Sequence, residues 1–110
     1  MKNFVQNGEN LTLPAPEDVT AGRGLLVGSI FGVAQETVLS GADVVVVRRG
    51  VFNHAKTSAQ AWSVGAKIYW DDTAKVFTST ESGNTLVGVA AAAAINPSDT
   101  GNVLLDGAVR

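Results

Sequence analysis

From residue 21 onward the sequence alternates short β-forming runs with breaks rich in Gly, Asn, Asp and Ser. This alternation of strand-forming and turn-forming segments constrains the fold more than any other feature. Many short strands with regular turn signals are typical of a β-sandwich or a small barrel. A helical turn or two is expected around residues 58–62, with Thr57 or Ser58 as its cap. The expected strands are residues 25–34, 36–39, 43–49, 51–55, 67–70, 75–79, 85–94 and 101–105. We therefore expect an all-β domain with at most one short helix.

The first twenty residues, MKNFVQNGENLTLPAPEDVT, differ from the rest of the chain. They hold Pro14 and Pro16, and residues that precede proline favour extended backbone. The pair Asn7-Gly8 lies between two short apolar runs, a pattern that favours a hairpin turn. We expect residues 1–20 to form an extended N-terminal arm and residues 21–110 to form a single β domain. The alternative is a terminal strand that packs on its own domain.

Two of the expected strands, DVVVVRR at 43–49 and LVGVAAAAAI at 86–95, are apolar on both faces. A half-exposed antiparallel strand normally alternates apolar and polar residues. The economical explanation is a partner that covers one face, because small side chains let another backbone approach closely. The alternative is a tight barrel interior beside an exposed alanine face. The residues expected to mediate self-association are Val44, Val46, Gly88, Ala90, Ala92 and Ala94.

Composition narrows the classes of partner. A chain of 110 residues is one domain of ordinary size, and it contains no cysteine for a disulfide or a thiolate metal site. Only 16% of its residues are charged and the net charge is −2, which argues against a nucleic-acid footprint. No apolar stretch approaches the ~20 residues of a membrane-spanning helix. The polar start of the sequence indicates no signal peptide.

Few residues support chemistry. The stretch AGRGLLVGS at 21–29 lacks the Gly-Lys-Ser/Thr of a phosphate-binding loop and the glycine spacing of a dinucleotide fingerprint. His54 is the only histidine, so neither a histidine relay nor a zinc cluster has support. Asp71 and Asp72 fall in an expected hairpin turn, where Asp is favoured for local hydrogen bonding. No catalytic, cofactor-binding or metal-ligating residue is predicted.

Trp62, Tyr69 and Trp70 leave a second function class open. Aromatic side chains can stack on a sugar, which would make the protein a carbohydrate- or receptor-binding β module. Tyr69 and Trp70 are adjacent on one expected strand, so their side chains point to opposite faces. At most one of them belongs to a given surface, and the inward one is expected to anchor the core.

Five stretches together resemble a known family: MKNFVQNGENLTLPAP, GRGLLVGSIFGVA, GVFNHAKTSAQAWSVGAKIYWDDTAKVFTST, GNTLVGVAAAAA and TGNVLLDG. The sequence resembles the small tailed-phage structural proteins known as capsid cement or head decoration proteins. Members of that family often carry an automatic label as recombinases. A strand-exchange ATPase requires a phosphate-binding loop and acidic metal-holding residues, and this sequence provides neither.

The resemblance implies a small β-barrel-like or β-tulip-like domain that clamps major capsid subunits from outside the shell, typically as a homotrimer. It implies a non-enzymatic protein on the outer capsid surface of a virion, with no cofactor, nucleic-acid, membrane or small-molecule partner. An extended arm can add a strand to a sheet edge of the capsid protein. The arm residues expected to bind the capsid are Lys2, Asn3, Phe4, Val5, Leu11, Leu13 and Pro14.

Overall fold

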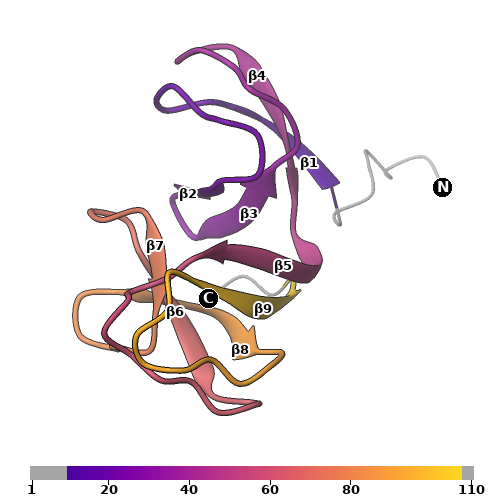
Figure 1. Ribbon diagram of the computed structural model, residues 1–110. Helices are drawn as coiled ribbons and strands as arrows, with labels where there is room; N and C mark the ends of the chain where they lie inside the picture. The colour runs from indigo at the N-terminus through magenta and orange to yellow at the C-terminus, as the bar shows by residue number, and fades with distance from the viewer. Residues whose placement is uncertain (1–9, 108–110) are drawn as a thin grey trace, which may run out of the picture.

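The computed structural model describes residues 10–107, and over that range the chain forms nine β-strands in two sheets and no helix. The four-stranded sheet has the antiparallel order β1-β4-β3-β2 and forms the upper part of the molecule in Figure 1. Its strands are β1 (Asn10–Pro14), β2 (Gly24–Val27), β3 (Ile30–Ala34) and β4 (Asp43–Val47). The expectation of an all-β fold is confirmed.

The second sheet has the order β5-β9-β8-β6-β7 and curls into a half-barrel. Its strands are β5 (Arg49–Ala55), β6 (Lys67–Asp71), β7 (Val76–Thr78), β8 (Thr85–Ala90) and β9 (Thr100–Asp106). Just after β5, Lys56 forms a parallel bridge with Phe77 of β7, and the Thr57 N–H donates to the Phe77 carbonyl at 2.9 Å. This contact brings the two outer strands of the sheet together.

Several expected strands have different bounds in the structure. Residues 25–34 form the hairpin of β2 and β3, with a tight turn at Gly28 and Ser29. Residues 36–39 contribute only a bridge between Val38 and Val19. In place of the short helix, residues 58–62 contain a turn at Ser58 and Ala59 and a bridge from Trp62 to Ala94. The strand expected at 85–94 ends at Ala90, because the backbone of Ala94 pairs with Trp62 outside the sheet.

The main hydrophobic core joins the two sheets. Phe31 of β3 lies 5.0 Å from Trp70 of β6 and 5.7 Å from Phe77 of β7, between ring centroids. Trp70 and Phe77 are 1% and 0% exposed, and such rings each bury about 150–250 Å². Gly24 of β2 rests on this cluster, since a Cβ there would lie 2.7 Å from the Trp70 ring. The aromatic cluster therefore fixes how the two sheets meet.

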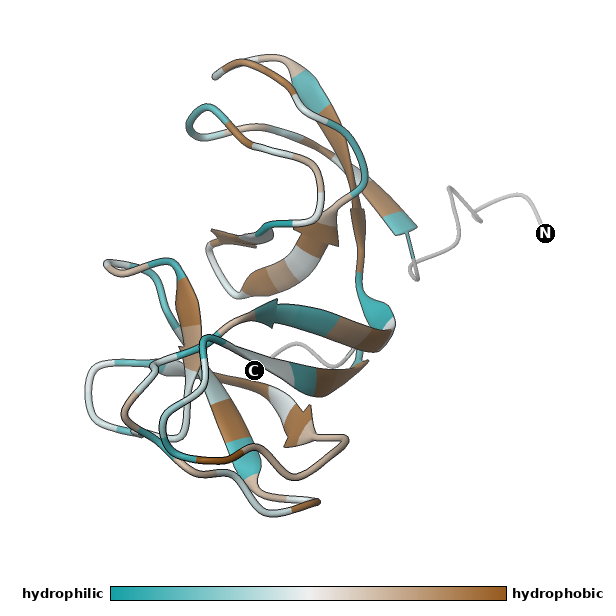
Figure 2. Cartoon of the chain, viewed as in Figure 1, coloured by the Kyte–Doolittle hydropathy of each residue, from teal (hydrophilic) through white to brown (hydrophobic). Residues whose placement is uncertain are grey.

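A second core lies within the four-stranded sheet. Val44 and Val46 of β4 are 0% and 1% exposed, and they pack with Leu25 and Ala34. Figure 2 shows hydrophobic residues concentrated along the strands of both sheets. Ala15 and Val19, which follow β1, are also buried in this second core. The described part of the expected arm thus contributes to the folded domain.

Candidate functional site

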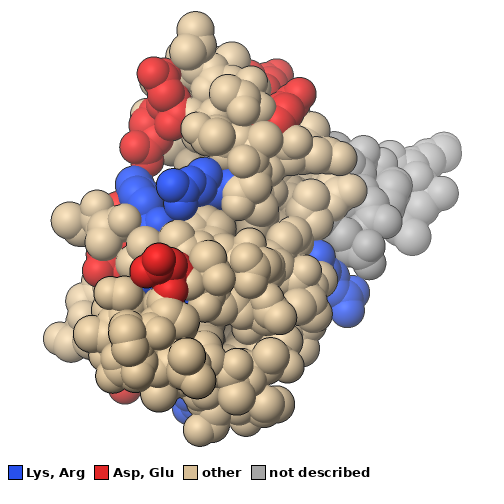
Figure 3. Space-filling model, in the orientation of Figure 1, with Lys and Arg blue, Asp and Glu red and all other residues tan. Residues whose placement is uncertain are grey.

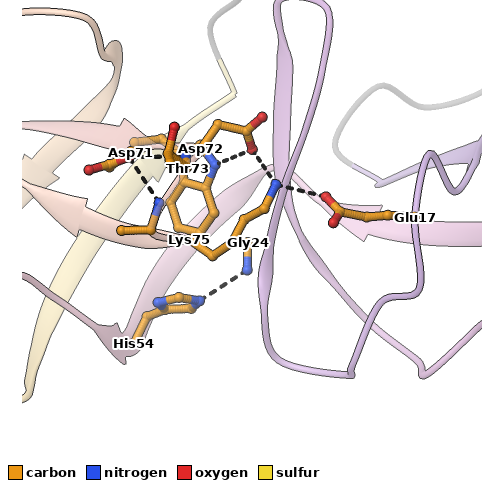
Figure 4. Close-up of polar contacts among 9 residues, drawn as sticks. Glu17, Gly24, His54, Asp71, Asp72, Thr73 and Lys75 are labelled. Atoms are coloured by element: carbon orange, nitrogen blue, oxygen red, sulfur yellow. Dashed lines mark hydrogen bonds and ion pairs between the residues drawn. The ribbon is translucent and has the colours of Figure 1, made fainter.

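Polar contacts between the two sheets define the seam, by which we mean the contact region between β2 and the β5–β7 side of the half-barrel. The Gly24 N–H of β2 donates to Nε2 of His54 on β5 at 3.0 Å (Figure 4). Lys75 donates to Glu17 at 2.7 Å and to Asp72 at 2.8 Å, which ties the β6–β7 turn to the segment after β1. These contacts supplement the aromatic cluster beneath them.

The seam borders a cleft of about 360 Å³, lined by residues 17–20, 23–25, 55 and 74–76. Figure 3 shows basic side chains at the boundary between the upper and lower parts of the molecule. Burial lowers the pKa of Lys75, but its contacts with Asp72 and Glu17 outweigh that effect and hold the pKa above its usual range. Burial raises the pKa of Asp72, but hydrogen bonds from Lys75 and Trp70 outweigh it and the net shift is downward. Within this cleft Lys75 is thus paired with two carboxylates of the same chain.

The outside of the half-barrel carries a row of apolar side chains, which we call the outer apolar face: Val51, Leu86, Val89 and Leu104. Leu104 of β9 stands opposite both Val51 of β5 and Val89 of β8 in the strand register. Val51 is 59% exposed and Leu104 is 41% exposed. Because apolar side chains on three neighbouring strands share this surface, it is a candidate for protein contact.

A β-bulge shapes the outer apolar face. The register of β6 and β8 shifts between Ile68 and Tyr69, so that Val87 becomes the extra residue and turns inward, where it is 5% exposed. At Gly88 an added Cβ would collide with the carbonyl oxygen of Leu104, so only glycine fits. A hollow of about 230 Å³ results, lined by Lys67, Leu86, Gly88, Val89, Leu104 and Asp106.

Two loops, residues 57–66 and 91–98, form what we call the apolar end of the half-barrel. Neither loop contains a charged residue, and Val64 and Ile95 are 69% and 75% exposed. Figure 2 shows hydrophobic residues in these loops at the lower end of the molecule. The alanine run leaves β8 and enters this end, where Ala94 pairs with Trp62 through two backbone hydrogen bonds of 2.9 and 3.0 Å.

Lys56 holds the apolar end from inside. It is 4% exposed, and its Nζ donates to the carbonyls of Thr57 at 2.8 Å, Gln60 at 2.6 Å and Ser98 at 3.2 Å. The ammonium also lies 5.4 Å from the centroid of the Trp62 ring, within cation–π range. A single buried cation thus joins both loops, which fixes the apolar end as a shaped surface.

Residues 5–105 match the phage cement protein family. The chain belongs to that family. No curated protein and no solved structure matches the chain. Membership gives this cement protein a structural role associated with the phage capsid, and the resemblance noted in the sequence is confirmed.

The expected capsid-binding arm of the cement protein falls into two parts. Leu11, Leu13 and Pro14 lie in β1, which pairs with β4 along its whole length, and the two leucines are half-buried against the second core. For residues 10–20 the structure therefore has the alternative arrangement, a terminal strand packed on its own domain. Lys2, Asn3, Phe4 and Val5 lie outside the described residues, so an arm formed by residues 1–9 stays a prediction.

The residues expected to mediate self-association of the cement protein lie in different environments within the folded chain. Val44 and Val46 fill the second core and Ala90 fills the main core at 1% exposure, so these three residues are covered by their own chain. Gly88 packs against β9 and lines the hollow of the outer apolar face. The fold thus covers the inner faces of both apolar strands, whereas Leu86 and Val89 of β8 remain on the outer apolar face. Ala92 and Ala94 are half-buried in the loop of the apolar end.

The outer apolar face was missed in the sequence, although a signal was present. Val103, Leu104 and Leu105 form an unbroken apolar run in a strand, and alternation requires one of them to face outward. Val51 and Phe52 of β5 give the same signal. Val64 and Ile95 of the apolar end lie in loops, where strand periodicity gives no guide.

The residues considered for chemistry have local structural partners. Asp71 accepts hydrogen bonds from the N–H groups of Thr73 and Ala74 at 3.0 and 3.1 Å, as expected for an Asp in a turn. Trp62 and Trp70 are 3% and 1% exposed, so both indoles belong to the core. Within residues 10–107, His, Asp and Glu nowhere gather in a group of three suited to a metal ion. No helix long and apolar enough to cross a membrane occurs in that range.

Proposed function

We propose that this protein binds the outer surface of the phage head and stabilises contacts between neighbouring major capsid subunits, without catalysing a reaction. The family match over residues 5–105 carries the proposal. The outer apolar face and the apolar end support it, because both expose large hydrophobic side chains. Burying such surface against another protein removes apolar area from water and favours association.

In this proposal the protein acts as a homotrimer. The outer apolar face replaces the buried strand faces as the self-association surface, because Val51 and Leu104 are exposed where Val44 and Val46 are not. The hollow above Gly88 gives this face a depression that an apolar side chain of a second copy fits. A trimer also multiplies weak contacts with a shell by avidity.

The arm is assigned to residues 1–9, which precede β1, an outer strand of the four-stranded sheet. Lys2, Asn3, Phe4 and Val5 are proposed to reach the capsid protein, where an extended segment can add a strand to an exposed sheet edge. Main-chain hydrogen bonds would supply affinity there, and the side chains of Phe4 and Val5 would supply apolar contact.

Binding to empty, expanded heads of the cognate phage tests the proposal. Labelled protein is mixed with heads that lack it, sedimented, and then challenged with an excess of unlabelled protein. We expect saturable co-sedimentation, displacement by the unlabelled protein, and heads that withstand a higher temperature once decorated. A folded protein that stays in the supernatant, or that binds without protecting the heads, would contradict the proposed role.

A further inference from the structure

The contact between His54 and Gly24 is a direct polar link between a strand of the half-barrel and a strand of the four-stranded sheet. His54 is 4% exposed, and its ring packs edge-on against Phe77 at 4.9 Å and Trp70 at 5.5 Å between centroids. Its Nε2 accepts the Gly24 N–H at 3.0 Å, as Figure 4 shows. The imidazole is therefore both a core ring and the acceptor for a backbone donor of another sheet.

The hydrogen bonds assign the protonation state of His54. A backbone N–H can only donate, so Nε2 must carry a lone pair and no proton. Nδ1 lies 3.0 Å from the Ala55 carbonyl, which can only accept, so Nδ1 carries the proton. His54 is thus a neutral imidazole with one defined tautomer. A second proton would sit on Nε2, directly opposite the Gly24 N–H, and two donors would face each other.

The charged groups around His54 do not offer a replacement contact. Just before β2 lies the cation Arg23, and beyond Phe77 and Trp70 the β6–β7 turn carries Lys75 and Asp72, which bond each other. Glu17 bonds Lys75, and Lys56, which follows the strand of His54, bonds the carbonyls of the apolar end. Burial lowers the pKa of His54; its hydrogen bond to Ala55 opposes this, and the charge of Arg23 lowers it further, with a net value below the ordinary one.

We propose that the His54–Gly24 contact is a pH-sensitive latch between the two sheets, which opens when His54 gains its second proton. Opening releases the start of β2 from the half-barrel, next to the cleft lined by Arg23 and Lys75. His54 is the only histidine and the chain has no cysteine, so few other groups change charge between about pH 5 and pH 7. The latch is a property of the folded chain and does not depend on capsid binding.

Amide hydrogen exchange with NMR detection tests the latch, with rates corrected for the intrinsic effect of pH. In the wild type we expect protection of the Gly24 amide to fall by about 10-fold or more between about pH 7.5 and pH 5, in step with the titration of the His54 ring signals. Amides of β8 serve as an internal control, because β8 lies between β9 and β6 in the middle of the five-stranded sheet, pairs with neither β2 nor β5, and should keep its protection.

Two variants separate the acceptor from the ring. His54→Gln keeps a side-chain acceptor that does not titrate, so Gly24 should exchange at a rate independent of pH. His54→Phe keeps an aromatic ring but has no acceptor, so Gly24 should exchange fast at both pH values. Unchanged protection of Gly24 after the wild-type ring has titrated would overturn the proposal, as would a ring that stays neutral down to about pH 4.5, or the same pH dependence in His54→Gln.

Discussion

Val51 of β5 and Leu104 of β9 stand directly opposite each other in an antiparallel pair, and both side chains face solvent at 59% and 41% exposure. An opposed apolar pair contributes little to the core when it lies on the outside of the sheet. Val89 of β8 extends the same row on the other side of Leu104. The pair therefore marks the centre of the surface that we assign to self-association.

Leu104→Asp should dissociate the oligomer without unfolding the subunit. A charge at the centre of a buried interface is costly without a partner, whereas the exposed position tolerates it in a monomer. Light scattering should report a mass reduced to that of one chain, with an unchanged circular dichroism spectrum. Leu39→Asp is the matched control. Leu39 is 71% exposed but lies in the loop between β3 and β4, away from the outer apolar face, so this variant should keep the mass of the wild type. Equal masses for wild type and Leu104→Asp would remove the outer apolar face as the interface.

Gly88→Ala should destabilise the fold by about 3 kcal/mol, because the new methyl group would collide with the backbone oxygen of Leu104 and force β8 and β9 apart. Urea denaturation measures the change. Gly32→Ala gives the comparison, since a Cβ there would lie 3.0 Å from its nearest neighbours and needs a smaller shift. A Gly88 variant as stable as the wild type would mean that the bulge relaxes at no cost.

Lys56→Met should destabilise the protein by about 2 kcal/mol and loosen the apolar end. The methionine keeps an unbranched stem against Trp62, but it leaves the carbonyls of Thr57, Gln60 and Ser98 without their donor. Urea denaturation gives the stability, and proteolysis within residues 57–66 reports the loosened loop. Greater stability in the variant would show that the desolvation penalty of the buried ammonium exceeds the stabilisation from its hydrogen bonds.

Stability should fall on acidification through His54. Its pKa is lowered in the folded state, so the unfolded chain binds the proton more readily. Neutral His54 adds to the free energy of unfolding. This stabilisation is complete above the ordinary histidine pKa of 6.5 and is lost as the pH falls through the lower pKa of the folded state. Thermal unfolding of wild type and His54→Gln across this range measures it, with a flat curve expected for the variant. The stability that Asp72 contributes persists across this range and is lost only at lower pH, because its pKa is lowered from the ordinary value of 3.8.

Sequence reasoning located the strands well where turn residues punctuate the chain. The expected strand at 67–70 corresponds to β6, and its Asp71-Asp72 turn leads into β7. The prediction of one strand at 25–34 is wrong, because Gly28 and Ser29 form a two-residue turn inside an apolar run and no cluster of polar residues marks that turn. Clusters of turn-forming residues therefore predict where strands begin and end, but they do not reveal a turn that needs only one glycine.

The choice of exposed faces was harder to predict. Four consecutive valines at 44–47 predict an outward apolar face, yet the fold buries Val44 and Val46 fully and leaves the other two half-buried. Which face a strand buries depends on the strands that cross it, and those come from segments far apart in the sequence. The exposed row at Val51 and Leu104 arises from the same long-range pairing of β5 and β9.

The last prediction concerns the N-terminal segment. Deletion of residues 2–9 should leave a folded domain that no longer binds expanded heads, because β1 and its pairing with β4 remain intact. Deletion of residues 2–16 should instead unfold or destabilise the domain. It removes Leu11, Leu13 and the buried Ala15 from the second core, which leaves Val44 and Val46 uncovered. Circular dichroism and thermal unfolding establish which variant is folded, and co-sedimentation with heads reports binding. If the 2–9 deletion decorates heads as well as the wild type, the capsid contact lies on the β framework itself, with the apolar end as its first candidate.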